Sequence, residues 1–219
     1  MPGSSAPGRP LRGRPVLVIA GLRRPGFGPF DLSVPPGTCC AVTGPSGAGK
    51  SVFLRMVADL DPCEGRVTLD GIDRDAVPAP LWRRRVTYLP AETGWWAETV
   101  GAHMAAPGPG FAADRAALRL PADVLDWPVA RLSTGERQRL AFLRGLAGNP
   151  RVLLLDEPTA ALDPAATEAV ETILRRRMAE GMAALLVSHA AEQVARLADA
   201  RFPVADGRPE IPAGRETSA

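Results

Sequence analysis

The sequence predicts an α/β fold with a mostly parallel sheet flanked by helices, plus a small inserted helical subdomain. First, short apolar runs bounded by turn residues recur, as strands buried on both faces of a parallel sheet require. Second, helical patterns separate several of these runs, which is the alternation typical of parallel α/β proteins. Third, residues 92–131 interrupt this alternation with aromatic, Ala-rich and Pro/Gly-rich pieces that show no strand pattern. The expected strands lie at 15–21, 38–44, 85–90, 151–157 and 182–189.

Three helices have recognisable starts. Residues 51–60 carry apolar side chains at helical spacing directly after a glycine-rich turn. Asp163 and Pro164 supply an N-cap and a first-turn proline for a second helix. Ser133 and Glu136 fit the S-x-x-E pattern of a capping box, which predicts a third helix that runs through Leu146.

These elements suggest one domain with an insertion. We expect the α/β core to comprise residues 15–91 and 132–207, and the helical subdomain to comprise 92–131. Residues 1–14 and 208–219 are rich in Pro, Gly, Ser or Arg and read as disordered segments. The first of these lacks the apolar centre of a signal peptide, so export is not expected.

The composition of the chain makes some classes of function less favoured than others. Of the 219 residues, 46% are hydrophobic and 23% are charged, and the formal net charge is +2. The arginines are scattered, and the two triplets at 83–85 and 175–177 read as solvated helix faces, so we expect no nucleic-acid partner. No apolar run approaches the roughly 18 residues that span a bilayer. Cys39, Cys40 and Cys63 form no metal-ligand pattern and suggest free thiols in a reducing cytosol.

A glycine-rich stretch, TGPSGAGKS at 43–51, contains Lys50, the chain's only lysine. It fits the phosphate-binding pattern G-x-x-x-x-G-K-[ST] between an expected strand and an expected helix. Backbone N–H groups of such a turn face phosphate oxygens, Lys50 reaches the outer phosphates as a compact charge, and the Ser51 hydroxyl can ligate Mg²⁺. The alternative is a plain strand-to-helix turn with an incidental lysine. The candidate nucleotide-binding residues are Gly44, Pro45, Ser46, Gly47, Ala48, Gly49, Lys50, Ser51 and Val52.

Two acids follow the apolar run RVLLLDE at 151–157. Ligands of open α/β sheets bind at the carboxyl ends of the strands. We therefore expect Asp156 to hold Mg²⁺, directly or through water, and Glu157 to orient or deprotonate an attacking water. The alternative is a buried strand that simply runs into a polar turn.

The segment LSTGERQRL at 132–140 resembles the LSGGQ signature of ATP-binding cassette (ABC) ATPases. Ser133 and Gly135 match, whereas Thr134 replaces a family glycine and Glu136 replaces the family glutamine. The resemblance implies a P-loop ATPase core. It also implies a head-to-tail homodimer in which Ser133, Gly135 and Glu136 of one copy contact the ATP held by the other. Without a ligand, the same segment is a well-capped helix start.

Further matches appear in the order of that family. Ala161, Leu162 and Asp163 resemble its D-loop, which touches the opposite site of the dimer. His189 resembles its switch histidine, implying a contact with the γ-phosphate and a catalytic role beside Glu157 and Lys50. We assign the other histidine, His103, a structural role.

Two further features depart from the family pattern, and a third carries a hypothesis about a partner. Ala91 stands where the family has a glutamine that contacts Mg²⁺ and water, and Glu92 is the nearest polar substitute. The adenine-stacking aromatic is not evident, with Phe27 and Phe30 as the only candidates. The adjacent indoles at 95 and 96 cannot both point inward on an extended stretch, so we expect one of them to anchor a membrane partner. The alternative is a tryptophan pair packed within the helical subdomain.

The resemblance implies the ATP-hydrolysing subunit of a transporter, with ATP and Mg²⁺ as cofactors. Its partners would be a second copy of the chain and a separate transmembrane permease. Its place would be cytoplasmic, on the inner face of the cell membrane. The alternatives are a soluble ABC ATPase outside transport and a cassette that binds ATP and regulates a partner with little turnover.

Overall fold

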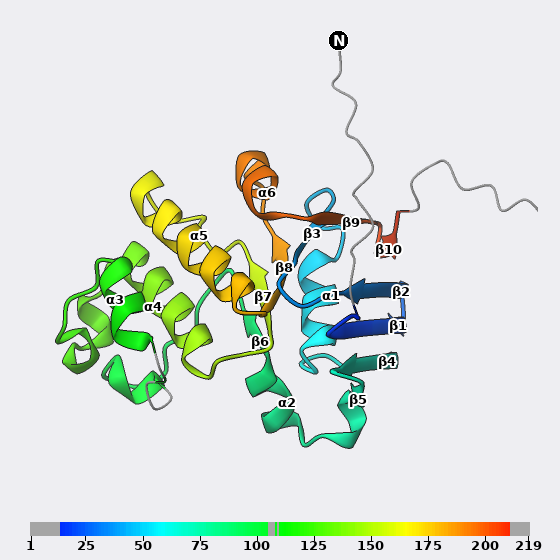
Figure 1. Cartoon of the computed structure of the whole chain (residues 1–219), viewed down its shortest axis with the longest axis horizontal. Coiled ribbons are helices and arrows are strands. Elements are labelled where there is room, and N and C mark those ends of the chain that lie inside the picture. The colour runs from blue at the N-terminus through cyan, green and yellow to red at the C-terminus, as the bar shows by residue number, and fades with distance from the viewer. Residues whose placement is uncertain (1–13, 105–107, 109, 211–219) are drawn as a thin grey trace, which may run out of the picture.

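A six-stranded central sheet forms the middle of the molecule (Figure 1). The computed structural model describes residues 14–104, 108 and 110–210. The strand order is β10-β9-β3-β8-β7-β6, and every pairing is parallel except that of β10 with β9. This confirms the predicted mostly parallel sheet. Its strands are β3 (Cys39–Thr43), β6 (Val86–Leu89), β7 (Val152–Asp156), β8 (Ala183–Val187), β9 (Ala200–Ala205) and β10 (Arg208–Pro209).

A second, antiparallel sheet lies beside the first, at the right of Figure 1. Its order is β2-β1-β4-β5, with β1 (Leu17–Arg24), β2 (Phe27–Val34), β4 (Glu64–Leu69) and β5 (Ile72–Asp73). The run at 15–21 is therefore a strand, but our assignment of it to the parallel sheet was wrong. In β1, Leu17, Ile19 and Leu22 are buried while Ala20 and Arg23 are exposed. One covered and one solvated face is typical of antiparallel sheets.

Two apolar clusters cover the two faces of the central sheet. On one face Val152 and Leu154 pack in a cluster with α1 (Lys50–Val57) and the antiparallel sheet. On the other face Leu153 and Leu155 pack in a cluster with α4 (Thr134–Ala147) and α5 (Pro164–Ala179). All five residues of β7 are buried because both of its faces are covered. Two shorter helices complete the core: α2 (Ala79–Arg85) and α6 (Ala191–Leu197).

The segment 92–131 forms a lobe around α3 (Phe111–Ala117), at the left of Figure 1. Besides α3, its described residues contain short 3₁₀ helices at 101–103, 124–126 and 129–131 and no named strand. The lobe is thus less helical than its description as a helical subdomain suggests, because prolines and glycines interrupt it. Its apolar residues belong to the same cluster as those of α4 and α5, so packing continues across 131–132.

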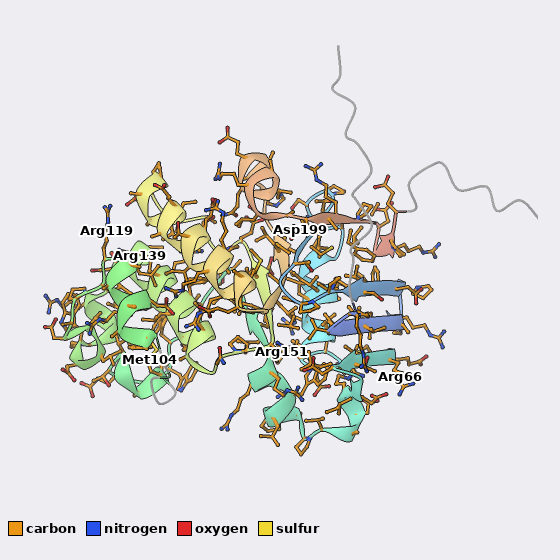
Figure 2. The ribbon with its side chains drawn as sticks, viewed as in Figure 1. Arg66, Met104, Arg119, Arg139, Arg151 and Asp199 are labelled. Atoms are coloured by element: carbon orange, nitrogen blue, oxygen red, sulfur yellow. The ribbon has the colours of Figure 1, made fainter. Side chains whose placement is uncertain are left out.

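The predicted helix starts are confirmed. Asp163 Oδ1 accepts a hydrogen bond of 2.7 Å from the Ala166 N–H, and Pro164 is the first residue of α5. At α4, Ser133 Oγ accepts from the Glu136 N–H, and Glu136 Oε2 accepts from the Ser133 N–H at 2.9 Å. Arg139, in the lobe region of Figure 2, donates from Nη1 to the Leu118 carbonyl and so joins α4 to the end of α3.

The expectation of solvated arginine triplets holds only in part. Arg83 is exposed and donates to the Asp59 carbonyl. Arg176 and Arg177, however, both pair with Asp114 of α3, whose side chain is buried. Only 12% of the Arg177 side chain is exposed. A buried carboxylate needs such cationic partners, which explains the difference.

Two residues near the C-terminus that we expected to be disordered form a strand. Residues 208–209, placed at the start of the disordered tail, form β10 and pair with β9. Residues 1–13 and 211–219 of the expected disordered ends lie outside the described residues. In the part of the chain that the structure describes, no helix has the length and apolar character needed to span a membrane.

The three cysteines are free, and two of them are buried. Burial is the main cause that raises the pKa of Cys40 to about 12, and it raises that of Cys39 as well. These thiols therefore behave as small apolar side chains, as predicted.

Candidate functional site

The central sheet presents an open cleft at the carboxyl ends of its parallel strands. The segments that follow β3, β6, β7 and β8 meet there because these strands run in one direction. The cleft has a volume of about 340 Å³. It is lined by Phe27, Ser46, Gly47, Gly49, Lys50, Ser51, Val52, Ala91, Asp156, Glu157, Val187 and His189. Most of the predicted nucleotide, metal and catalytic residues thus come together.

The glycine-rich turn after β3 wraps around Lys50, the first residue of α1. Lys50 Nζ donates to the carbonyl oxygens of Gly44 at 2.8 Å and Pro45 at 2.7 Å, and the residue is 8% exposed. Gly49 caps the helix with φ of 92°, and a Cβ there would lie 2.4 Å from the Phe27 ring. At Gly44 a Cβ would lie 1.9 Å from the Val204 carbonyl oxygen. Only glycine fits either position.

Three residues of the predicted binding loop do not line the cleft. Gly44 and Pro45 face Lys50 with their carbonyl groups, and Ala48 is buried beneath the turn. The Ala48 carbonyl accepts a hydrogen bond from the Gly207 N–H at 3.0 Å. These three residues therefore shape the loop from behind.

The two predicted carboxylates differ in surroundings. Asp156 is 5% exposed, and its Oδ2 accepts a hydrogen bond of 2.9 Å from the Tyr88 hydroxyl. Burial and the nearby Asp156 carboxylate raise the pKa of Tyr88, so Tyr88 stays a donor. Glu157 has φ of 49°, a conformation unusual for a residue with a side chain. Its N–H donates to the Val187 carbonyl at 2.9 Å.

His189 lies against the Glu157 carboxylate. The His189 N–H donates to Glu157 Oε2 at 3.3 Å, and His189 Nε2 lies 3.6 Å from Glu157 Oε1. That second oxygen is buried without a hydrogen-bond partner. The His189 side chain is 64% exposed at the mouth of the cleft. A carboxylate oxygen without a partner, on a residue that lines the cleft, suits a ligand that brings its own donor.

The cleft offers a donor set that fits Mg²⁺. Ser51 and Asp156 present hydroxyl and carboxylate oxygens, which are the ligands that this cation prefers. No group of three or more His, Cys, Asp or Glu residues among the described residues could hold a metal by protein ligands alone. Mg²⁺ usually keeps waters and takes phosphate oxygens, so a site of this kind completes its coordination with the nucleotide.

The signature residues lie outside this cleft, at the start of α4. Ser133 Oγ donates to Glu136 Oε2 at 2.7 Å, and this bond, followed by that of the Ser133 N–H, lowers the pKa of Glu136. Gly135 adjoins the segment that resembles a D-loop, since a Cβ there would lie 3.6 Å from the Ala161 carbonyl oxygen. None of Ser133, Gly135 and Glu136 lines the cleft of its own copy.

The structure places the two pairs of residues between which the sequence could not choose. Phe27 lines the cleft, whereas Phe30 is fully buried and packs on Phe53 with ring centroids 4.9 Å apart. Ala91 also lines the cleft, whereas Glu92 does not and is exposed. Ala91 thus leaves its part of the cleft without a polar side chain.

The tryptophan pair splits between the interior and the surface. Trp95 packs against the apolar cluster of the lobe, whereas Trp96 is 75% exposed. Arg144 lies over both rings, at 4.8 Å and 5.3 Å. His103 is buried, and its Nε2 accepts from the N–H groups of Trp96 and Ala97, which gives it the predicted structural role.

Sequence reasoning missed two polar side chains of the site. Tyr88 lies in β6, next to β7, and no local pattern links it to Asp156. Gln138 of α4 donates to the Glu157 carbonyl at 2.9 Å. The segment that resembles the signature contains Gln138, but nothing in that resemblance marked its side chain.

Comparison with known proteins agrees with this geometry. A family model described as ABC transporter matches residues 27–160. Protein STAR1 of Oryza sativa subsp. japonica is 39% identical over 181 residues, which are 77% of this chain and 52% of the rice protein. This chain thus spans about half the length of that relative. The thiamine import ATP-binding protein ThiQ of Escherichia coli strain K12 is 36% identical over 200 residues, 82% of each protein. A solved structure, of the ATP binding subunit of an ABC transporter, shares the fold with a TM-score of 0.82 and 22% identity. The match covers 90% of this chain and 88% of that one.

Proposed function

The chain belongs to the ABC transporter family as an ATPase cassette, and from this premise we propose that it powers transport through a separate membrane permease. The observation that carries the proposal is the cleft in which Lys50, Asp156, Glu157 and His189 converge. Catalysis of phosphoryl transfer to water depends mainly on positioning the reactants and on stabilising charge. These side chains can do both.

Phosphate binding begins with the turn around Lys50. When ATP binds, the β- and γ-phosphates replace the carbonyl oxygens of Gly44 and Pro45 as partners of Lys50 Nζ. The N–H groups at the start of α1 contribute further donors. Phe27 lines the cleft beside this turn. In this proposal its ring stacks on the adenine.

Ser51 and Asp156 would hold Mg²⁺ beside the phosphates, and the ion would neutralise charge on the phosphate oxygens. Glu157 lines the cleft and its Oε1 has no hydrogen-bond partner, so in this proposal its carboxylate accepts a proton from the attacking water. His189 contacts the same carboxylate and orients the water and the γ-phosphate.

A second copy of the chain completes the site in this proposal. The first residues of α4 do not line the cleft of their own copy, and Ser133 is exposed at the helix N-terminus. A head-to-tail dimer brings this helix start to the triphosphate in the partner's cleft. ATP binding then closes the dimer, and hydrolysis reopens it.

The permease contact in this proposal is the exposed ring of Trp96. This indole is held by Arg144 and by the buried His103. A rigid exposed tryptophan is a typical interface anchor. The chain would work in the cytoplasm, bound to the inner face of the membrane through this contact.

Phosphate release by the purified chain tests the enzymatic part. We expect steady hydrolysis of ATP with Mg²⁺ by the wild type, and a loss of about a hundredfold or more in Glu157→Gln. Glu168→Gln on α5 is the matched control, since Glu168 is an exposed carboxylate remote from the cleft. Equal phosphate release by the wild type and Glu157→Gln would refute hydrolysis at this site.

A regulatory cassette is the second candidate, and Ala91 favours it. A methyl group cannot relay hydrogen bonds between Mg²⁺ and water. Retention of ATP without phosphate release, in the presence of the permease, would select this alternative. Removing Trp95 and Trp96 together tests the transport part, because co-purification with the permease should be lost while ATP binding persists.

A further inference from the structure

Gln138 connects the start of α4 to the main chain on both sides of the catalytic loop. Its Nε2 donates to the Glu157 carbonyl at 2.9 Å, and its Oε1 accepts from the Ala161 N–H at 3.0 Å. The residue is 7% exposed. The amide cannot be reversed, because its donor end would then face the Ala161 N–H and its acceptor end the Glu157 carbonyl.

The Glu157 peptide needs such support. At φ of 49° this residue occupies the left-handed region, which persists only where surrounding contacts hold it. The Val187 carbonyl holds its N–H at 2.9 Å, and Gln138 holds its carbonyl group. The direction in which the Glu157 carboxylate enters the cleft therefore depends on β8 on one side and on α4 on the other.

The same loop adjoins the signature segment. Gly135 lies one helical turn before Gln138, and a Cβ there would lie 3.6 Å from the Ala161 carbonyl oxygen. On the other side of the loop, Gln193 of α6 donates to Thr159 Oγ1 at 3.0 Å. Residues 157–161 are thus clamped between α4 and α6, so a shift of α4 displaces the Glu157 peptide.

We propose that Gln138 is a positioning residue through which contact of the α4 start with the partner's nucleotide sets the orientation of Glu157 in its own copy. The inference rests on the proposed function, since it requires a dimer in which α4 reaches the other site. Binding at one cleft then aligns the catalytic carboxylate of the other cleft. The two sites of the dimer hydrolyse ATP cooperatively for this reason.

Two substitutions test the two hydrogen bonds of Gln138. Gln138→Met keeps the length of the side chain but removes both hydrogen bonds. Gln138→Glu keeps an acceptor for the Ala161 N–H but sets a second acceptor against the Glu157 carbonyl. For each variant we would measure kcat, the ATP concentration dependence of the rate, the ATP dissociation constant and the midpoint of thermal unfolding.

We expect kcat to fall about ten- to a hundredfold in both variants, because a small misplacement of a catalytic group costs that much. The Hill coefficient for ATP should fall toward 1, while the dissociation constant for ATP stays within about twofold of the wild-type value, because the cleft itself is intact. If Gln138 had a purely structural role, kcat, the Hill coefficient and the ATP dissociation constant would all worsen together.

Several outcomes would overturn the inference. Wild-type kcat and Hill coefficient in Gln138→Met would show that the contacts do not position Glu157. Parallel loss of ATP binding and of thermal stability in both variants would assign Gln138 to packing alone. Failure of the proposed function is distinguishable, because the wild type itself would then release no phosphate, whereas a wild type that releases phosphate without cooperativity would overturn this inference alone.

Discussion

The Tyr88 hydroxyl donates a hydrogen bond of 2.9 Å to Asp156 Oδ2 across the parallel pair β6 and β7. This hydrogen bond fixes the orientation of the Asp156 carboxylate, which we propose as a ligand of Mg²⁺. The Tyr88 hydroxyl does not bond to the other carboxylate oxygen. A buried carboxylate without a fixed orientation would have to be ordered each time the cation arrives.

We therefore expect Tyr88→Phe to raise the Mg²⁺ concentration needed for half-maximal nucleotide binding by about three- to tenfold, the effect of losing about 1 kcal/mol, the typical net contribution of one hydrogen bond. Titration of Mg²⁺ against binding of a fluorescent ATP analogue measures this directly. Thr87→Val is the control, because it removes a hydroxyl on the same strand that bonds only to carbonyl groups of α2. An unchanged Mg²⁺ dependence in Tyr88→Phe would contradict the assignment.

Ala91 leaves a methyl group in the cleft where the family has an amide. Ala91→Gln should raise kcat several-fold with little change in ATP affinity, because the new side chain can orient water only after the nucleotide is bound. Steady-state phosphate release at saturating ATP measures the change. Glu92→Gln adds an amide at the neighbouring exposed position and should have no effect. A kcat unaltered or lowered by Ala91→Gln would mean that the chain positions its water by other groups.

Asp114 holds α3 of the lobe against α5 through Arg176 and Arg177. Because its carboxylate is buried, Asp114→Asn should lower the free energy of unfolding by about 3–5 kcal/mol, the usual cost of breaking a buried ion pair on one side. Arg66→Gln breaks a pair with Asp73 at the surface of β4 (Figure 2) and should cost at most about 1 kcal/mol. Urea unfolding of both variants gives the comparison, and equal costs would refute the anchoring role.

Glu171 makes the stability of the folded protein depend on pH in the acidic range. Its burial alone would raise the pKa of the carboxyl group, but hydrogen bonds and charge from Arg196, with help from Gln193 and Arg175, outweigh burial and lower it. A carboxylate with a lowered pKa in the folded state stabilises the protein above its unfolded pKa, and this contribution disappears as pH falls.

The difference in thermal midpoint between the wild type and Glu171→Gln should therefore be largest near neutral pH. It should narrow as the pH drops below about 4.3, the ordinary pKa of glutamate. Glu192→Gln, at an exposed position on α6, should show a small difference at every pH. A gap for Glu171→Gln that is constant from pH 3 to pH 7 would contradict the linkage.

Local signals made much of the fold predictable. The turn at Lys50, the capping box at Ser133 and the Asp163–Pro164 start are decided by neighbouring residues, and the structure confirms the helix that follows each. Strands β2 and β9 escaped prediction because each contains a proline, Pro29 or Pro203, which counts against a strand.

Contacts between distant segments were not predictable from the sequence. Tyr88 meets Asp156, and Asp114 meets Arg177, only after the sheet and the helices have packed. The candidate cleft residues were found because their pattern is local to the end of each strand. Their supporting side chains, such as Gln138, carry no pattern of their own.

The carboxylate of Glu136 gives the α4 start a charge that a glutamine would lack. Since its pKa is lowered, this group is ionised at neutral pH. In the proposed dimer it approaches a triphosphate, so closure brings two anions together. Dissolved ions weaken that repulsion, which links the assembly of the two copies to the ionic strength around them.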